Sequence, residues 1–185
     1  MRTSNARAVL SALLAACAAA AAPASAGDVK GTVTYAGAAP TLPPLKATKD
    51  TSVCGNEVPD ESLEVANGKI HNVVVTIEGA AAKAEPGTIT VDQHKCRYVP
   101  HVQAAPVGSN LDILNSDGML HNIHGYLGTA TIFNLAMPLK DQKLTRKLAK
   151  GGLVRLKCDV HSWMSGYVVV TDSPFALSGK DGAFV

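Results

Sequence analysis

Aromatic side chains and runs of like charge are both scarce in this sequence. Phe, Trp and Tyr make up 4% of its 185 residues, and methionine occurs four times. No basic amphipathic stretch is present, which argues against binding to a membrane surface. The hydrophobic share is nevertheless 46%, which is enough to bury the core of one domain with a small extra layer.

A net positive charge is also missing once the first 26 residues are set aside. These residues begin with Arg2 and Arg7, continue in an apolar run over residues 8–22, and end in Ala24-Ser25-Ala26, the small-residue pattern of a signal-peptide cleavage site. Without the two arginines, the 17 basic residues fall to 15 and equal the 15 acidic ones. A neutral mature chain lacks the basic face with which a nucleic-acid-binding protein neutralises phosphates.

The apolar run is too short to span a membrane, because a spanning helix needs about 20 apolar residues. A second processing route competes with cleavage after Ala26. Leu14-Ala15-Ala16-Cys17 resembles a bacterial lipobox, in which Cys17 is acylated and becomes the first residue of a lipid-anchored protein. We favour cleavage after Ala26, and both routes predict export to the periplasm.

Cysteine occurs an odd number of times in the predicted mature chain. Cys54, Cys96 and Cys158 remain after cleavage, and an oxidising compartment favours one disulfide bond plus one thiol with another role. Cys54 and Cys96 lie in loop-like stretches, whereas Cys158 ends a predicted strand, so we expect the first two to pair. In the chain-entropy model, closing such a loop stabilises the fold by about 4 kcal/mol. The alternative is two unpaired loop thiols.

The hydrophobic pattern predicts strands and almost no helix. β-Branched runs and alternating patterns, separated by Gly- and Pro-rich turns, mark residues 29–35, 73–77, 88–91, 101–105, 111–115, 131–135, 153–158 and 167–171. The uninterrupted β-branched run at 73–77 is typical of a central strand. Residues 140–149 have ambiguous apolar spacing, and we expect loop and strand there. Many short strands at this spacing predict an all-β sandwich or barrel.

A cluster of metal-binding residue types follows the strand predicted at 153–158. Along that strand Val154, Leu156 and Cys158 share one face and two cations share the other, so Cys158 takes the buried face. The tight loop that follows adds His161 and Met164 at spacings of three residues each. A thiolate, an imidazole and a thioether form a soft ligand set that suits copper, whereas zinc rarely binds a thioether.

A blue copper site needs a second imidazole beside the thiolate, the first imidazole and a weak axial Met. His121 and His124 lie upstream on extended chain, and residues three apart on a strand point to opposite faces. We choose His121, because Asn122 after it can hydrogen-bond the ligand loop and tie the two halves of the site together. For His124 we expect a partly exposed strand position. The competing interpretation is that a buried Cys, His and Met are ordinary core residues, and the conjunction of motifs argues against it.

Five motifs follow one another along residues 96–172: Tyr98-Val99-Pro100, Val107-Gly108, Leu111-x-Ile113-x-Asn115, His121-Asn122 and Cys158-x-x-His161-x-x-Met164. Together they resemble the cupredoxin family, and the short ligand loop resembles amicyanin more than plastocyanin. The resemblance implies a Greek-key β-sandwich that binds one copper ion through His121, Cys158, His161 and Met164. The longer layout is similar to that of exported bacterial proteins labelled methylamine-utilisation or plastocyanin-like.

The residue patterns predict a domain organisation, and the resemblance implies a function. We expect a signal peptide at 1–26, an N-terminal β extension at 27–95, a copper domain at 96–172, and a tail at 173–185 that completes the N-terminal sheet or begins a further strand. The copper ion would pass single electrons between periplasmic redox proteins, such as a c-type cytochrome or a dehydrogenase, without catalysis. On the tight loop, His161 is expected to be the solvent-exposed point of electron exchange. Trp163 beside it either seals the site or forms an apolar docking patch.

Two other functions compete with electron transfer. A copper carrier or storage protein generally uses an open, Met-rich site, and four methionines are few for one. An enzyme needs an open coordination position and a substrate pocket, which the spare histidines would have to build. We expect His71 and His94 at the surface. His101 follows Pro100 near the copper end of the predicted sandwich, so it is a candidate for a supporting or additional ligand.

Overall fold

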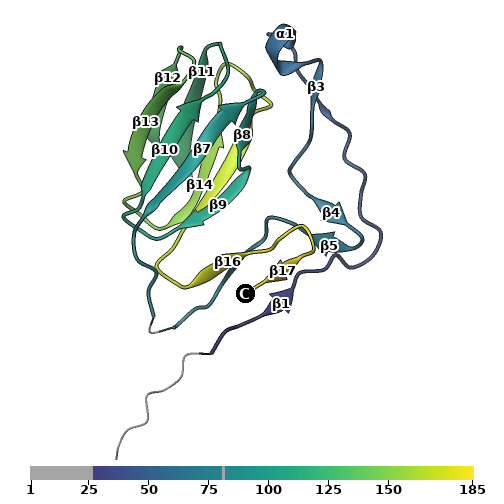
Figure 1. Cartoon of the computed structure of the whole chain (residues 1–185), viewed down its shortest axis with the longest axis vertical. Helices are drawn as coiled ribbons and strands as arrows, with labels where there is room; N and C mark the ends of the chain where they lie inside the picture. The colour runs from purple at the N-terminus through teal and green to yellow at the C-terminus, as the bar shows by residue number, and fades with distance from the viewer. Residues whose placement is uncertain (1–26, 81) are drawn as a thin grey trace, which may run out of the picture.

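Two β-sheets with a shared hydrophobic core form the main body of the chain (Figure 1). The computed structural model describes residues 27–80 and 82–185, so the predicted signal peptide at 1–26 and its lipobox cysteine Cys17 lie outside the described residues. The first sheet has the order β13-β10-β7-β8 and comprises β7 (Thr88–His94), β8 (Arg97–Val99), β10 (Asn110–Asn115) and β13 (Gln142–Lys147). The second has the order β12-β11-β14-β15-β9 and comprises β9 (Val102–Ala105), β11 (His121–Leu127), β12 (Ala130–Met137), β14 (Gly152–Lys157) and β15 (Ser165–Val170).

Both sheets combine antiparallel and parallel neighbours. β10 runs parallel to β7 and β15 runs parallel to β9, whereas the other neighbours in the two sheets are antiparallel. Parallel strands need a crossover connection, so the chain passes between the sheets in the way that a Greek key requires. The predicted all-β sandwich is therefore confirmed.

The core between the sheets is built by strict alternation along the strands. Leu111 and Ile113 of β10 are fully buried in the same cluster as Val154 and Leu156 of β14. Successive side chains of a strand point to opposite faces, so the cations of β14 are exposed while its valine and leucine are buried. Cys158, which follows β14, continues the buried face as predicted.

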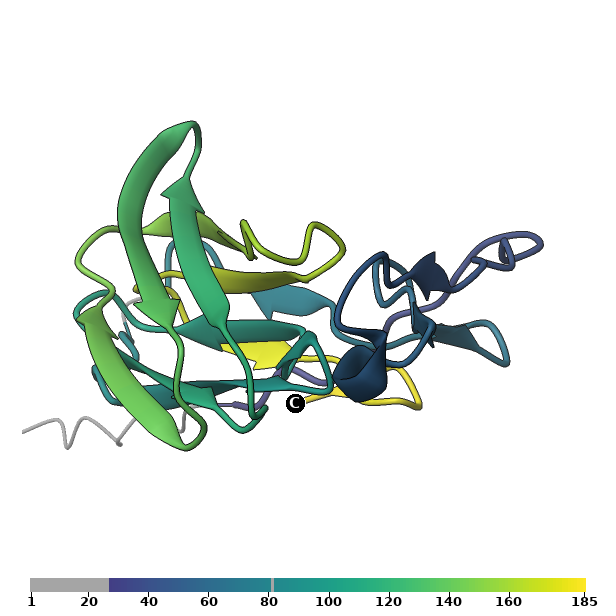
Figure 2. The ribbon, with the colours of Figure 1, turned by 90° about the horizontal axis from the view of Figure 1, so that it is seen from above.

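Short paired strands and one turn of helix lie beside the sandwich (Figures 1 and 2). The helix is α1 (Thr51–Cys54). The strand pairs are β1 (Gly31–Thr32) with β17 (Ala183–Phe184), β2 (Leu45–Lys46) with β3 (Glu57–Val58), β4 (Val65–Ala66) with β5 (Lys69–Ile70), and β6 (Val74–Thr76) with β16 (Phe175–Leu177). Two of these pairs join residues 27–80 to the C-terminal tail, as one of the two interpretations of the tail requires.

Several elements differ from the sequence-based expectation. The strand expected at 29–35 is reduced to two residues, and the run at 73–77 forms β6, which has β16 as its one partner and is not a central strand. β-Branched residues favour extended chain but do not select a partner, and here the long strands of the sandwich pair with each other. The sandwich also begins at β7, so the boundary expected at residue 96 falls inside its first sheet. Among the described residues, no helix is long and apolar enough to cross a membrane.

Candidate metal centre

Three of the predicted ligands meet at one end of the sandwich. His121 is the first residue of β11, Cys158 directly follows β14, and His161 lies in the turn between β14 and β15. One donor atom from each lies within 4.8 Å of the donors of the other two, and all three side chains are buried. β11 and β14 are antiparallel neighbours, so the start of β11 lies beside the end of β14 and the ligands converge although they are far apart in sequence.

Met164 closes the same turn. Its backbone N–H donates to the carbonyl oxygen of His161 at 2.9 Å, and its side chain is 1% exposed within the core cluster. This hydrogen bond fixes the separation of Met164 from His161 along the loop. The structure thus buries all four predicted ligand side chains.

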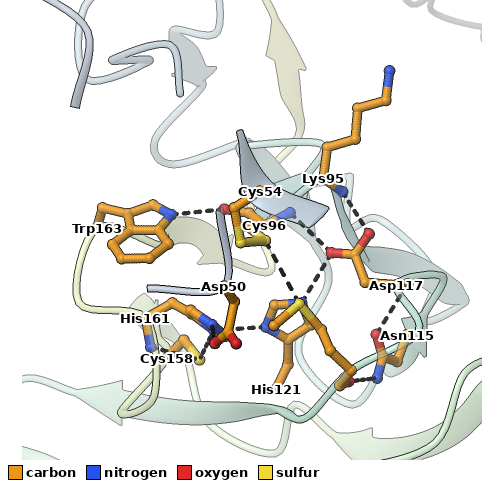
Figure 3. The surroundings of a disulfide bond; sticks show 11 residues. Asp50, Cys54, Lys95, Cys96, Asn115, Asp117, His121, Cys158, His161 and Trp163 are labelled. Atoms are coloured by element: carbon orange, nitrogen blue, oxygen red, sulfur yellow. Dashed lines mark hydrogen bonds and ion pairs between the residues drawn. A yellow bond between two sulfur atoms is a disulfide. The ribbon is translucent and has the colours of Figure 1, made fainter. Parts of the chain in front are cut away.

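The two imidazole rings present the same nitrogen to the centre. Nδ1 of His121 lies 3.0 Å from Nδ1 of His161, which is 3.7 Å from the Cys158 sulfur. The outer nitrogens are occupied: Nε2 of His121 is 2.9 Å from Asp117 Oδ2, and Nε2 of His161 is 2.9 Å from Asp50 Oδ2 (Figure 3). Carboxylates accept hydrogen bonds, so both Nε2 atoms carry protons and both Nδ1 lone pairs point inward.

Two inward nitrogen atoms 3.0 Å apart beside the Cys158 sulfur can share a cation, either a proton or a metal ion. A His side chain whose outer N–H is held by a carboxylate is the usual form of a metal-ligating histidine. The donor set of two imidazoles and a sulfur therefore fits copper, which accepts soft thiolate and imidazole ligands.

The electrostatics of the buried groups agree with this arrangement. Burial disfavours a charged His121, but its hydrogen bond to Asp117 and the neighbouring Cys158 outweigh burial and raise the pKa of His121 to about 9. Burial likewise opposes a Cys158 thiolate, but the contact with His121 and nearby backbone N–H groups lower the pKa of Cys158. For His161, burial lowers the pKa, and the Asp50 carboxylate opposes that shift. A thiolate and a neutral inward His161 nitrogen are the forms that bind a metal.

Asn122 ties β11 to the ligand loop, as predicted. Its side-chain oxygen accepts the backbone N–H of Asp159 at 2.6 Å and lies 3.4 Å from the Cys158 sulfur. Its side-chain nitrogen donates to Asp159 Oδ2 at 3.0 Å and to Asn134 Oδ1 at 2.9 Å. The contacts with Cys158 and Asp159 hold the loop in place without help from a metal.

The spare histidines lie elsewhere. His124 faces away from the centre, with Nδ1 3.1 Å from Asp159 and Nε2 2.8 Å from Thr131, which confirms that it and His121 occupy opposite faces. His94 is exposed, and the partly buried His71 is bound to Glu64. His101 is buried with its ring edge-on to Tyr167, and it belongs to none of the donor groups found among the described residues.

One sequence-based expectation about His161 is wrong. The loop histidine was expected to be exposed, yet its side chain is fully buried because Asp50 of the N-terminal extension reaches its outer nitrogen. Trp163 contributes to the enclosure: its indole N–H donates to the carbonyl oxygen of Cys96 at 3.2 Å, and its ring lies 5.1 Å from the His161 ring. Of the two roles considered for Trp163, these contacts favour sealing.

Sequence reasoning missed the two carboxylates. Asp117 precedes His121 by four residues, a separation that places side chains together on a helix but not on irregular chain, so its position carried no usable signal. Asp50 is 111 residues from His161. By contrast, the predicted disulfide joins Cys54 to Cys96, and Cys158 is the free cysteine of the described residues.

A second group of candidate ligands shares His121 and adds Cys96 and Asp117. Since the sulfur of Cys96 is bonded to Cys54, it offers no thiolate, and the group is not a separate metal site.

Comparison with known proteins places these observations in context. No family model matches the chain. It is 33% identical over 94 residues to amicyanin from Paracoccus denitrificans, a match that spans 49% of this chain and 71% of that protein. Among solved structures, a Cu(I) form of a mutant amicyanin is 29% identical, with 45% of this chain and 82% of that chain covered at a TM-score of 0.41. A purple cupredoxin from Nitrosopumilus maritimus is 23% identical, with 44% and 98% covered at a TM-score of 0.39.

Proposed function

The chain belongs to the cupredoxin family, and from this premise we propose that it is an exported mononuclear copper protein that relays single electrons. Family membership supports a copper electron-transfer protein in general. The more specific proposal is that one copper ion binds to Nδ1 of His121, the sulfur of Cys158, Nδ1 of His161 and the thioether of Met164. The observation that carries this proposal is the pair of inward Nδ1 atoms, 3.0 Å apart, beside the Cys158 sulfur.

Copper, when bound, supplies a one-electron couple between Cu(I) and Cu(II). The chain's own residues contribute a fixed and dry setting for it. Asp117 orients His121 and is itself held by the backbone N–H groups of Lys95 and Cys96 at 2.8 and 2.9 Å. A backbone N–H of His161 lies 3.4 Å from the Cys158 sulfur and stabilises negative charge there. Donors that are fixed before loading need little rearrangement when the charge of the centre changes.

The proposed location is the periplasm, with a redox protein such as a c-type cytochrome or a dehydrogenase as partner. Two features support it: the signal-peptide pattern at residues 1–26, and the Cys54–Cys96 disulfide, a bond that persists in oxidising compartments. We propose no catalytic activity. The cavity beside Trp163 and Met164 measures about 20 Å³, room for about one water molecule.

Visible absorption of the copper-loaded, oxidised protein tests the proposed site. We expect an intense thiolate-to-Cu(II) band in the wild type and its loss in Cys158→Ser. Met164→Gln should retain copper but lower the reduction potential, because an oxygen donor favours Cu(II) over Cu(I). A colourless oxidised copper complex of the wild type would refute the thiolate site.

Copper exchange separates the relay from the alternative, a copper carrier or storage protein. A relay keeps its ion, so transfer of Cu(I) from the wild type to a chelator of modest affinity should be slow. Rapid transfer, together with a reduction potential that does not respond to Met164→Gln, would favour the carrier.

A further inference from the structure

Residues 45–58, which we call the cap, lie against the end of the sandwich that holds His161. The cap consists of β2, α1 and β3, and it is closed on itself by the β2–β3 pairing and by a hydrogen bond from Ala47 N–H to Asn56 O at 2.9 Å. It is joined to the sandwich by the disulfide between Cys54 and Cys96 and by the contact between Asp50 and His161 (Figure 3), and Ala47 packs in the core cluster of the sandwich. The cap is therefore a compact unit attached to the sandwich at defined points.

The conformation of Asp50 shows that its side chain serves His161 and not the helix. Asp50 directly precedes α1, where an aspartate normally caps the helix through its side chain, yet this side chain makes no capping hydrogen bond. Its backbone has φ of 53°, in the left-handed region, which aspartate adopts more readily than most residues other than glycine. The carboxylate instead reaches Nε2 of His161 at 2.9 Å. The Asp50 side chain therefore contacts His161 in place of the helix cap that its position offers.

We propose that residues 45–58 are a tethered cap that closes the copper site at His161, with Asp50 as the positioning residue for that ligand. The proposal rests on the proposed copper site and deepens it. Asp50 holds the Nε2–H form of His161 and so directs Nδ1 toward the metal position. The cap also replaces solvent at this edge, which leaves His161 with no exposed surface.

Cys96 connects the cap to both halves of the site. Its sulfur is bonded to Cys54 of the cap, its backbone N–H donates to Asp117 at 2.9 Å, and its carbonyl oxygen accepts the Trp163 indole N–H. Asp117 in turn holds His121, while Trp163 belongs to the ligand loop. The disulfide thus attaches the cap to Cys96, the residue that already contacts both Asp117 and Trp163, and so keeps the cap next to the site.

Closure has two consequences for a relay. Because His161 is buried under the cap, small ligands and chelators can reach it only after the cap opens. The cap therefore slows the loss of copper. The negative charge of Asp50 next to His161 favours the more positive ion, so Asp50 lowers the reduction potential. Asp50 is 46% exposed, and solvent screening makes this second effect modest.

The first arm of the test uses the metal-free, oxidised, folded protein and does not depend on copper. Cys158 is 3% exposed and lies behind His161, so its reaction rate with a disulfide thiol reagent reports cap opening. Compared with the wild type, Asp50→Ala should react about three- to tenfold faster, and Asp50→Glu should restore part of the protection. The double variant Cys54→Ser/Cys96→Ser should react faster still. Asp60→Asn removes a charge from the same extension without touching His161 and should react at the wild-type rate.

The second arm uses the copper-loaded protein, with Asp50→Asn as a variant of nearly the same shape. Its reduction potential should exceed that of both the wild type and Asp60→Asn, and it should lose copper to a chelator faster. Wild-type thiol reactivity in Asp50→Ala and in the disulfide double variant would overturn the cap. An unchanged potential in Asp50→Asn would overturn the positioning role. Failure of the wild type to bind copper would refute the proposed function instead, and the metal-free arm would still decide whether the cap exists.

Discussion

Replacing Asn122 tests how much its side chain stabilises the ligand loop in the metal-free protein. The side-chain oxygen of Asn122 accepts the backbone N–H of Asp159 at 2.6 Å. Asn122→Ala removes a side chain that is 6% exposed, together with its hydrogen bonds to the Asp159 N–H, to Asp159 Oδ2 and to Asn134 Oδ1. Each such hydrogen bond contributes about 0.5–1.5 kcal/mol to stability.

We therefore expect Asn122→Ala to lower the free energy of unfolding of the metal-free protein by about 2 kcal/mol, with a fall in Tm of about 4–8 °C for a chain of this size. Urea denaturation measures the first quantity, and its slope should stay unchanged because the surface exposed on unfolding is the same. The matched control is Asn134→Ala, which removes a partner of the Asn122 amide nitrogen and leaves the oxygen contacts in place. That control should cost about 0.5 kcal/mol. Equal losses in the two variants would refute the reasoning.

Two further predictions concern the covalent link and the packing of the sandwich. Thiol titration of the unfolded, metal-free, non-reduced mature protein should find one free thiol, and protease mapping should assign it to Cys158; three free thiols would contradict the Cys54–Cys96 pairing. Gly125→Ala should lower the free energy of unfolding by about 1–3 kcal/mol, because the added methyl group would lie 2.6 and 2.8 Å from Cε2 and Cε1 of the Phe133 ring. Gly118→Ala, with no atom within 4 Å of the added group, should leave Tm nearly unchanged, and a similar loss in both variants would show that packing against Phe133 is not the cause.

The parts of the site that sequence could predict are those set by local periodicity. Alternation along β14 fixed which face Cys158 takes, and the same rule separated His121 from His124. The ligand loop spans seven residues, so the spacing of Cys158, His161 and Met164 does not depend on how the rest of the chain folds. These inferences need one strand or one turn, and they need no knowledge of which strands become neighbours.

The parts that sequence could not predict depend on long-range placement. The contact between Asp50 and His161 exists because a disulfide and a two-strand pairing bring the extension to the end of the sandwich. Neither Asp50 nor Asp117 lies in a sequence motif. The same limit explains the strand at 73–77. Its β-branched residues predicted extended chain correctly, but the choice of β16 as its partner is made by the tail, about 100 residues later.

Asp117 and Asp50, the carboxylates that contact the two histidines, differ in solvent exposure and in the number of hydrogen bonds that hold them. Asp117 is 5% exposed and accepts three hydrogen bonds, from two backbone N–H groups and from His121. Burial opposes its negative charge, but these hydrogen bonds prevail and lower the pKa of Asp117. Asp50 is 46% exposed and directly precedes a four-residue helix outside the sandwich. Solvent weakens a charge interaction at an exposed site far more than at a buried one, so of the two proposed ligands we expect His121 to be the more firmly oriented and His161 the more adjustable. Any partner or condition that displaces the cap therefore acts on the His161 side of the centre, while the His121 side keeps its geometry.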